Sequence, residues 1–104
     1  MQADLPQVMN LNAEPKETLE LYGINGGATD TFGRQCLLAR RLVERRVRFV
    51  EVNHAPNSND SGWDQHNHLP RYHASHAREI DKPIAGLLID LKRRGLLDHT
   101  LVVW

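Results

Sequence analysis

Histidine and aspartate side chains with metal-binding potential crowd into one short stretch of the sequence. Five of the six histidines are His54, His66, His68, His73 and His76. Asp64 precedes His66 by two positions and His68 by four. Carboxylate and neutral imidazole are ligands that zinc and related divalent ions favour. Because such short spacing lets one loop supply two ligands, Asp64 and His66 are candidate metal ligands, with His68 as the substitute for His66 and a further ligand required from elsewhere.

The same stretch has a simpler interpretation, a polar surface loop rich in histidine in which no ligands converge. We expect His73 and His76 to be surface residues near the start of a helix. His99 is expected to be structural or exposed, and Trp63 to pack the loop rather than stack on a ligand. His54 follows an apolar run directly and is intermediate between these interpretations.

Other kinds of reactive group have weaker support in this sequence. Cys36 is the single cysteine, which excludes an internal disulfide, and it lies on the apolar stripe of a predicted helix. We therefore expect it to be a small core residue. No serine occurs in a Gly-x-Ser-x-Gly context, and the glycines match no phosphate-binding fingerprint.

The elements expected around the histidine-rich stretch alternate between helix and strand. Apolar residues recur at helical spacing on both sides of it, and a β-rich run, residues 47–53, leads into it. In chain order we expect a helix over residues 13–21, a helix from Thr29 or Asp30 to about Arg45, and a strand over 47–53. A loop over 54–72 should follow. We then expect a helix over 75–94, with a kink or restart at Pro83 and a stop at Gly95, and a strand over 100–104.

This order of elements predicts an α/β fold with one right-handed βαβ unit and two neighbouring parallel strands. Parallel strands need helices on both faces of the sheet, which indicates a three-layer α/β/α arrangement. The loop would leave the carboxyl end of the first strand, where open α/β sheets bind ligands. Residues 1–12 are polar, so we expect them to be an irregular entry segment. Because two strands leave sheet edges open, we expect residues 13–104 to be a partial domain, truncated at both ends.

Composition narrows the classes of partner. The chain of 104 residues has thirteen basic and thirteen acidic side chains, so its formal net charge is zero and neither nucleic acid nor an anionic membrane is expected as a partner. No apolar run approaches the roughly 20 residues that a membrane-spanning helix needs. We expect Arg40, Arg41 and Arg45 to form a solvated helix face rather than an anion site.

Several motifs, in matching order, resemble a bacterial family of sulfatase-like proteins known as domain of unknown function 1501. The resemblance extends from about residue 13 to the end of the chain. The strings that carry it are residues 35–50, Gly62-Trp63-Asp64-x-His66, Asp81-Lys82-Pro83-Ile84-Ala85, residues 94–98 and Thr100-Leu101-Val102-Val103. That family is placed in the alkaline phosphatase superfamily, whose members are metal-dependent phosphatases, sulfatases and phosphomutases.

The resemblance implies that this chain is a fragment of a metal-dependent hydrolase of small-molecule or polysaccharide sulfate or phosphate esters. It also implies that Asp64 and His66 correspond to metal-ligand positions for a divalent ion such as zinc or calcium. The superfamily's nucleophile is not among these residues, so the fragment alone is expected to be inactive. Export by a twin-arginine signal, absent here, is a further implication. The alternative is a non-catalytic binding or surface protein that retains the fold.

Overall fold

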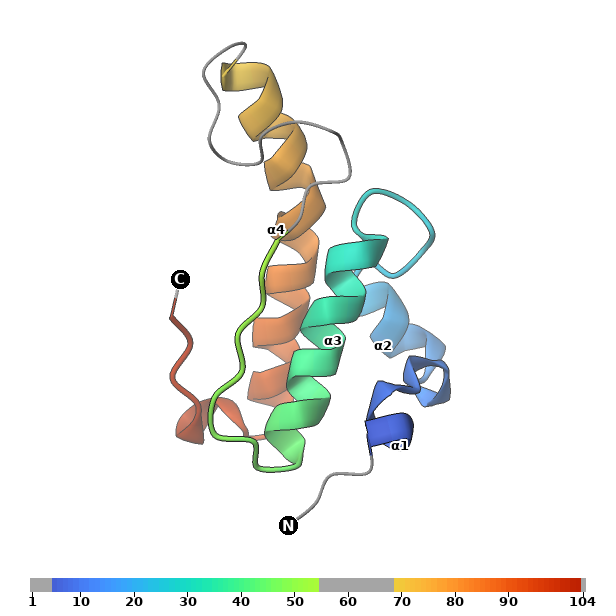
Figure 1. The fold of residues 1–104 in the computed structure, drawn as a ribbon, viewed down its shortest axis with the longest axis vertical. Helices are drawn as coiled ribbons and strands as arrows, with labels where there is room; N and C mark the ends of the chain where they lie inside the picture. The colour runs from blue at the N-terminus through green and yellow to red at the C-terminus, as the bar shows by residue number, and fades with distance from the viewer. Residues whose placement is uncertain (1–4, 55–68, 104) are drawn as a thin grey trace.

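Two helices that run side by side in the same direction form the body of the structure (Figure 1). The computed structural model describes residues 5–54 and 69–103. The elements in chain order are α1 (Leu5–Met9), the 3-10 helix η1 (Leu11–Ala13), α2 (Lys16–Leu21), α3 (Asp30–Glu44), α4 (Leu69–Arg93) and the 3-10 helix η2 (Leu97–His99). Residues 5–9, within the segment expected to be irregular, thus form a helix.

The apolar stripe predicted for α3 is confirmed. Phe32, Cys36 and Ala39 are buried at helical spacing. They join a core with Tyr22 and Leu37, both fully buried, and with residues of α4. The helix ends at Glu44, one residue before the predicted end. Periodicity located this helix well because its hydrogen bonds are local and one face packs on a single neighbour.

Two glycines allow the turn after α2 to press against both long helices. A Cβ atom on Gly33 of α3 would lie 2.3 Å from the carbonyl oxygen of Tyr22. A Cβ atom on Gly86 of α4 would lie 2.4 Å from the carbonyl oxygen of Leu21. Atoms cannot approach that closely, so a side chain at either position would push the turn away. The glycines therefore hold the Leu21–Tyr22 backbone against α3 and α4.

Helix α4 differs from its prediction at one end and in its middle. It begins at Leu69, so the predicted loop to residue 72 and helix start at residue 75 were wrong. Pro70 suits the first turn, because N–H groups there have no hydrogen-bond partner within the helix and proline has no N–H to leave unpaired. The helix runs through the buried Pro83 without a restart. It ends at Arg93, and Gly95 with φ of 72° follows as the predicted stop.

The α/β prediction was wrong: the described residues contain no strand and no βαβ unit. Residues 47–54 and 100–103 are irregular segments on one side of the α3–α4 pair (Figure 1). A groove of about 840 Å³ is lined by both segments, and Phe49, Leu101 and Val103 beside it are more than 80% exposed. A β-rich sequence becomes a strand only when another strand completes its hydrogen bonds. Within the described ranges these two segments do not pair.

Candidate functional site

The three residues predicted as metal ligands, Asp64, His66 and His68, lie outside the described residues, as does Trp63. The backbone of His73 and His76 belongs to α4. The structure therefore does not test the predicted ligand set. The structure does describe the two elements that flank this stretch in the sequence. One is the irregular segment that ends at residue 54, and the other is α4.

A buried histidine–glutamate pair lies where those two flanking elements meet. Nε2 of His54 is 3.0 Å from Oε1 of Glu79. Their side chains are only 8% and 7% exposed. The ring of Phe32 contacts the His54 imidazole edge-on, with centroids 5.3 Å apart and ring planes at 83°. Three elements thus fix this pair: the start of α3, the end of the 47–54 segment and α4.

Sequence reasoning left His54 undecided and missed Glu79. A signal for Glu79 was present, because it lies next to Ile80 at the buried edge of the α4 stripe, where a carboxylate is unusual. Asp90 occupies the equivalent face three turns later, before the buried Leu91. A carboxylate within an apolar helical stripe needs a specific partner, and such positions are candidates for a site.

A second buried cluster is centred on Arg40 of α3. Its Nε donates to Oδ2 of Asp90 and its Nη2 donates to Oε2 of Glu14, both at 2.8 Å. Its Nη1 donates to Glu44 one turn along the same helix. The Arg40 side chain is 3% exposed, so the predicted solvated face was wrong for this residue. Three carboxylates replace the water that an arginine normally keeps.

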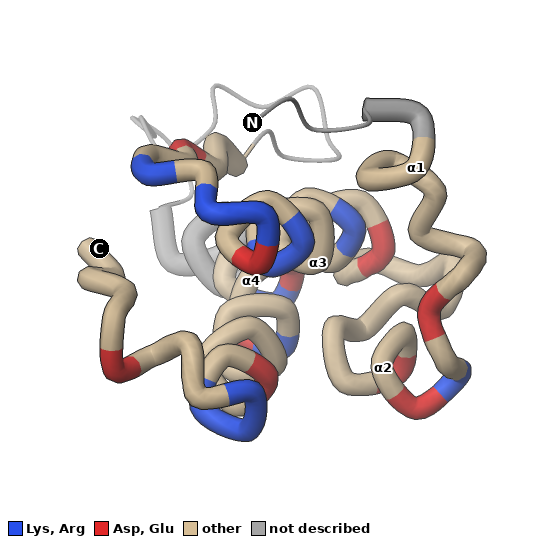
Figure 2. The backbone as a smooth tube through the Cα atoms, turned by 90° about the horizontal axis from the view of Figure 1, so that it is seen from below, with Lys and Arg blue, Asp and Glu red and all other residues tan. Residues whose placement is uncertain are grey.

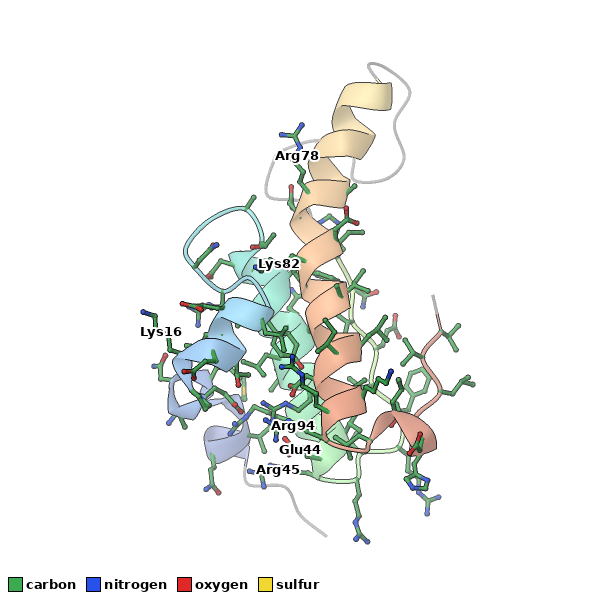
Figure 3. All side chains as sticks on the ribbon, turned by 180° about the vertical axis from the view of Figure 1, so that it is seen from behind. Lys16, Glu44, Arg45, Arg78, Lys82 and Arg94 are labelled. Atoms are coloured by element: carbon green, nitrogen blue, oxygen red, sulfur yellow. The ribbon has the colours of Figure 1, made fainter. Side chains whose placement is uncertain are left out.

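Neighbouring arginines extend the cluster to the N-terminal segment and to the end of α4. Arg41 donates from Nη1 to Glu14, and from Nε and Nη2 to the carbonyl oxygens of Val8 and Gln7. Its side chain is 13% exposed, so Arg41 also departs from the predicted solvated face. Arg94 donates to Asp90 at 2.8 Å and to Glu44 at 3.4 Å (Figure 3).

The arginines of this cluster lower the pKa values of its buried carboxylates. Burial favours the neutral form of Glu14, but the hydrogen bonds and charges of Arg41 and Arg40 outweigh it, so the pKa of Glu14 lies below its ordinary value. Burial also favours the neutral form of Asp90. The hydrogen bonds from Tyr22 and Arg94 and the charge of Arg40 outweigh burial, so the pKa of Asp90 is lowered as well. Burial and the neighbouring Asp90 raise the pKa of Tyr22.

The two clusters differ in what they can do chemically. Three guanidinium groups face three carboxylates around Arg40, so no net charge remains there for a ligand, and the cluster acts as a structural tie. Acidic and basic positions are interspersed in the same way over the helices (Figure 2). The pair of His54 and Glu79 instead offers an imidazole nitrogen and a carboxylate oxygen, donors that suit a divalent cation.

Two other predicted residues are placed by the structure. Cys36 is 1% exposed in the core, as predicted, and burial raises the pKa of its thiol to about 12. A thiol held protonated is a poor nucleophile. His99 lies in η2 and is exposed. Among the side chains that the structure describes, those of residues 7–54 and 77–103, no group of three or more His, Cys, Asp or Glu could hold a metal ion.

None of the helices in the described part of the chain is long and apolar enough to cross a membrane.

Comparisons with known proteins give one match. No curated protein and no solved structure matches the chain. A family model matches all of residues 1–104, and its description is protein of unknown function (DUF1501). The resemblance seen in the motifs is thereby confirmed at the level of the family, and the chain belongs to the DUF1501 family.

Proposed function

We propose that the protein is a metal-dependent hydrolase of sulfate or phosphate esters, related to the sulfatase-like branch of the alkaline phosphatase superfamily. The observation that carries the proposal is the string Gly62-Trp63-Asp64-x-His66, in which Asp64 and His66 have the residue types and spacing of metal ligands. His68 is the substitute for His66. The string lies within residues 1–104, which the family model matches.

The donor set fits a divalent cation such as zinc or calcium. Asp64 and His66 supply an oxygen donor and a nitrogen donor, the two donor types that such an ion binds. A divalent ion bound by such groups polarises an ester oxygen and lowers the pKa of its nucleophile. In this proposal the protein residues bind and orient the ion, and the helices α3 and α4 hold both ends of the ligand-bearing segment.

Metal analysis of four single variants of the full-length protein tests the proposal. Asp64→Ala and His66→Ala should each lower the bound metal substantially, because each removes a ligand. His73→Ala and His76→Ala are the controls, since they remove nearby imidazoles and should leave the metal content unchanged. Unchanged metal content in both Asp64→Ala and His66→Ala would contradict the ligand assignment.

Hydrolysis assays separate the proposed enzyme from a non-catalytic relative. The full-length protein should hydrolyse an aryl sulfate or an aryl phosphate, and removal of the metal with a chelator should abolish that activity. A protein that binds metal at Asp64 and His66 but turns over neither ester would instead be a binding or surface protein that has kept the ligands.

A further inference from the structure

We propose that the groove lined by the 47–54 and 100–103 segments binds an extended polypeptide strand that carries carboxylates at one end. Both segments begin near the ends of α3 and α4 and run back along the same side of the helix pair (Figure 1). The groove has a volume of about 840 Å³, which lies within the usual range of ligand-binding clefts. None of its described lining residues belongs to the predicted metal site, so the inference does not depend on the proposed function.

Backbone groups along both segments lack partners. The N–H groups of Val47 and Thr100 still bond to the turns before them, at 3.1 and 3.3 Å. After these turns, the backbone of residues 48–53 and 101–103 makes no hydrogen bond to any described residue. Unpaired N–H and C=O groups along a segment outside any helix offer hydrogen bonds to another strand. Both walls of the groove can therefore donate hydrogen bonds to an extended chain and accept them from it.

Apolar side chains around the groove form an open patch. Phe49, Leu101 and Val103 line the groove and are more than 80% exposed. In the same segment as Phe49, Val52 packs against the core. A single exposed apolar residue is ordinary, but several that gather on one surface with polar groups at its rim mark a site where another molecule is buried. A strand seated in the groove would cover this patch, and the burial of apolar surface would drive the association.

The end of the groove beside the ends of α3 and α4 is basic. Arg46 and Arg48 line it, are exposed, and have no carboxylate partner among the described residues. Lys92 and Arg93 continue the basic surface at the end of α4, on the side of the molecule that Figure 2 views. Glu51 is the single acidic residue among the described residues that line the groove. Because the planar guanidinium group matches a carboxylate, this charge distribution favours a strand with acidic residues beside Arg46 and Arg48.

An extended strand matches these features better than other occupants. A helix uses its own backbone groups internally and would leave those of the groove walls unpaired. A strand pairs with the walls and places alternate side chains over the apolar patch. A second copy of the chain is a poorer match, because its own 47–53 segment carries Arg48 as well as Glu51 and so has no excess of carboxylates.

Fluorescence anisotropy with labelled peptides tests the inference on the 104-residue chain. The probes are peptides of about six residues, the usual length of a strand, that alternate valine and threonine and carry glutamates at either the N- or the C-terminus. One of the two strand directions brings the glutamates beside Arg46 and Arg48, so at least one probe should bind saturably. Lysine in place of glutamate should weaken binding about tenfold or more, because like charges are then juxtaposed. Methylation of the peptide nitrogens, which removes the N–H donors and keeps the side chains, should abolish binding.

Substitutions on the groove wall locate the binding surface. Arg48→Glu should weaken binding of the glutamate probe about tenfold or more and improve binding of the lysine peptide, since the charge beside the probe is reversed. Phe49→Ala should also weaken binding, because it removes part of the apolar patch. Both side chains are exposed, so the helices should fold as in the native chain. Arg78→Glu makes the same charge change at an exposed position of α4 outside the groove and is the matched control (Figure 3).

The inference would be overturned if neither glutamate probe bound saturably, if the glutamate and lysine peptides bound with equal affinity, or if binding survived methylation of the peptide nitrogens. Sedimentation of the chain without peptide completes the test. A monomer that binds the glutamate probe is the expected result. A stable dimer that does not bind the probe would make a second copy the occupant of the groove, and would also contradict the inference.

Discussion

The hydroxyl of Tyr22 donates a hydrogen bond of 2.7 Å to Oδ2 of Asp90, 68 positions later in the chain. The same oxygen accepts from Nε of Arg40 at 2.8 Å. Both Tyr22 and Asp90 are buried. One carboxylate on α4 therefore joins the turn after α2 to α3, and it makes the packing of the two long helices depend on the chain that precedes them.

Loss of the Asp90 carboxylate should destabilise the fold strongly. Asp90→Ala removes acceptors used by Tyr22, Arg40 and Arg94, and it leaves the buried guanidinium of Arg40 with fewer counter-charges. Breaking a buried ion pair from one side costs about 3–5 kcal/mol. The free energy of unfolding, measured by urea denaturation, should fall by about 3 kcal/mol or more. Asp98→Ala, at an exposed position, is the control, and an equal effect in both variants would refute the assignment.

Acid should remove the contribution of the same cluster. The pKa values of Glu14 and Asp90 are lowered from 4.5 and 3.8 in the folded chain, so their contribution is fully present above the pKa values of the unfolded state. It is lost as the pH falls through the lower folded pKa values, because protons then bind to the folded carboxylates too. The free energy of unfolding should decrease from about pH 5 downwards. A double variant, Glu14→Gln with Asp90→Asn, should show a shallower slope, and an unchanged slope would contradict this origin.

A methyl group at either close-approach glycine should disrupt the packing of the turn after α2. Gly33→Ala and Gly86→Ala place a Cβ 2.3 Å and 2.4 Å from backbone oxygens of Tyr22 and Leu21. Backbone cannot yield as a side chain does, so each variant should lose about 1–3 kcal/mol of stability despite the better helix propensity of alanine. Gly27→Ala is the control, since its Cβ would meet only the Asn25 side chain. Thermal unfolding followed by circular dichroism measures the difference.

The thiol of Cys36 should resist modification in the folded protein. It is 1% exposed, and burial raises its pKa to about 12, so almost no thiolate forms near neutral pH. A disulfide reagent that releases a coloured thiolate should react slowly with the native chain. After unfolding in urea it should react with one equivalent of thiol. Phe49→Cys places a thiol at an 81% exposed position and should add one equivalent that reacts at once. Rapid reaction of Cys36 itself would contradict its core placement.

Local patterns in the sequence were enough to find α3 and the end of α4, although they missed α1 and the first turns of α4. The stripe of Phe32, Cys36 and Ala39 located α3, and Gly95 located the end of α4. A helix makes its hydrogen bonds within a few residues, so its own sequence carries the information. The motif around Asp64 and His66 likewise identified the family, whereas the role of these two residues as ligands stays a prediction.

Only the tertiary structure decided the features that depend on distant partners. The 47–53 run has strand propensity, but a strand needs a second chain segment to complete its hydrogen bonds, and within the described residues no segment pairs with it. Arg40 appeared to belong to a solvated face because spacing along one helix cannot reveal Glu14 or Asp90. The pair of His54 and Glu79 is likewise invisible in the sequence, since the two residues meet only when α4 packs beside the segment that precedes it. Contacts between residues far apart in the chain are set by the packing of whole elements, and sequence periodicity reports only the face that each element buries.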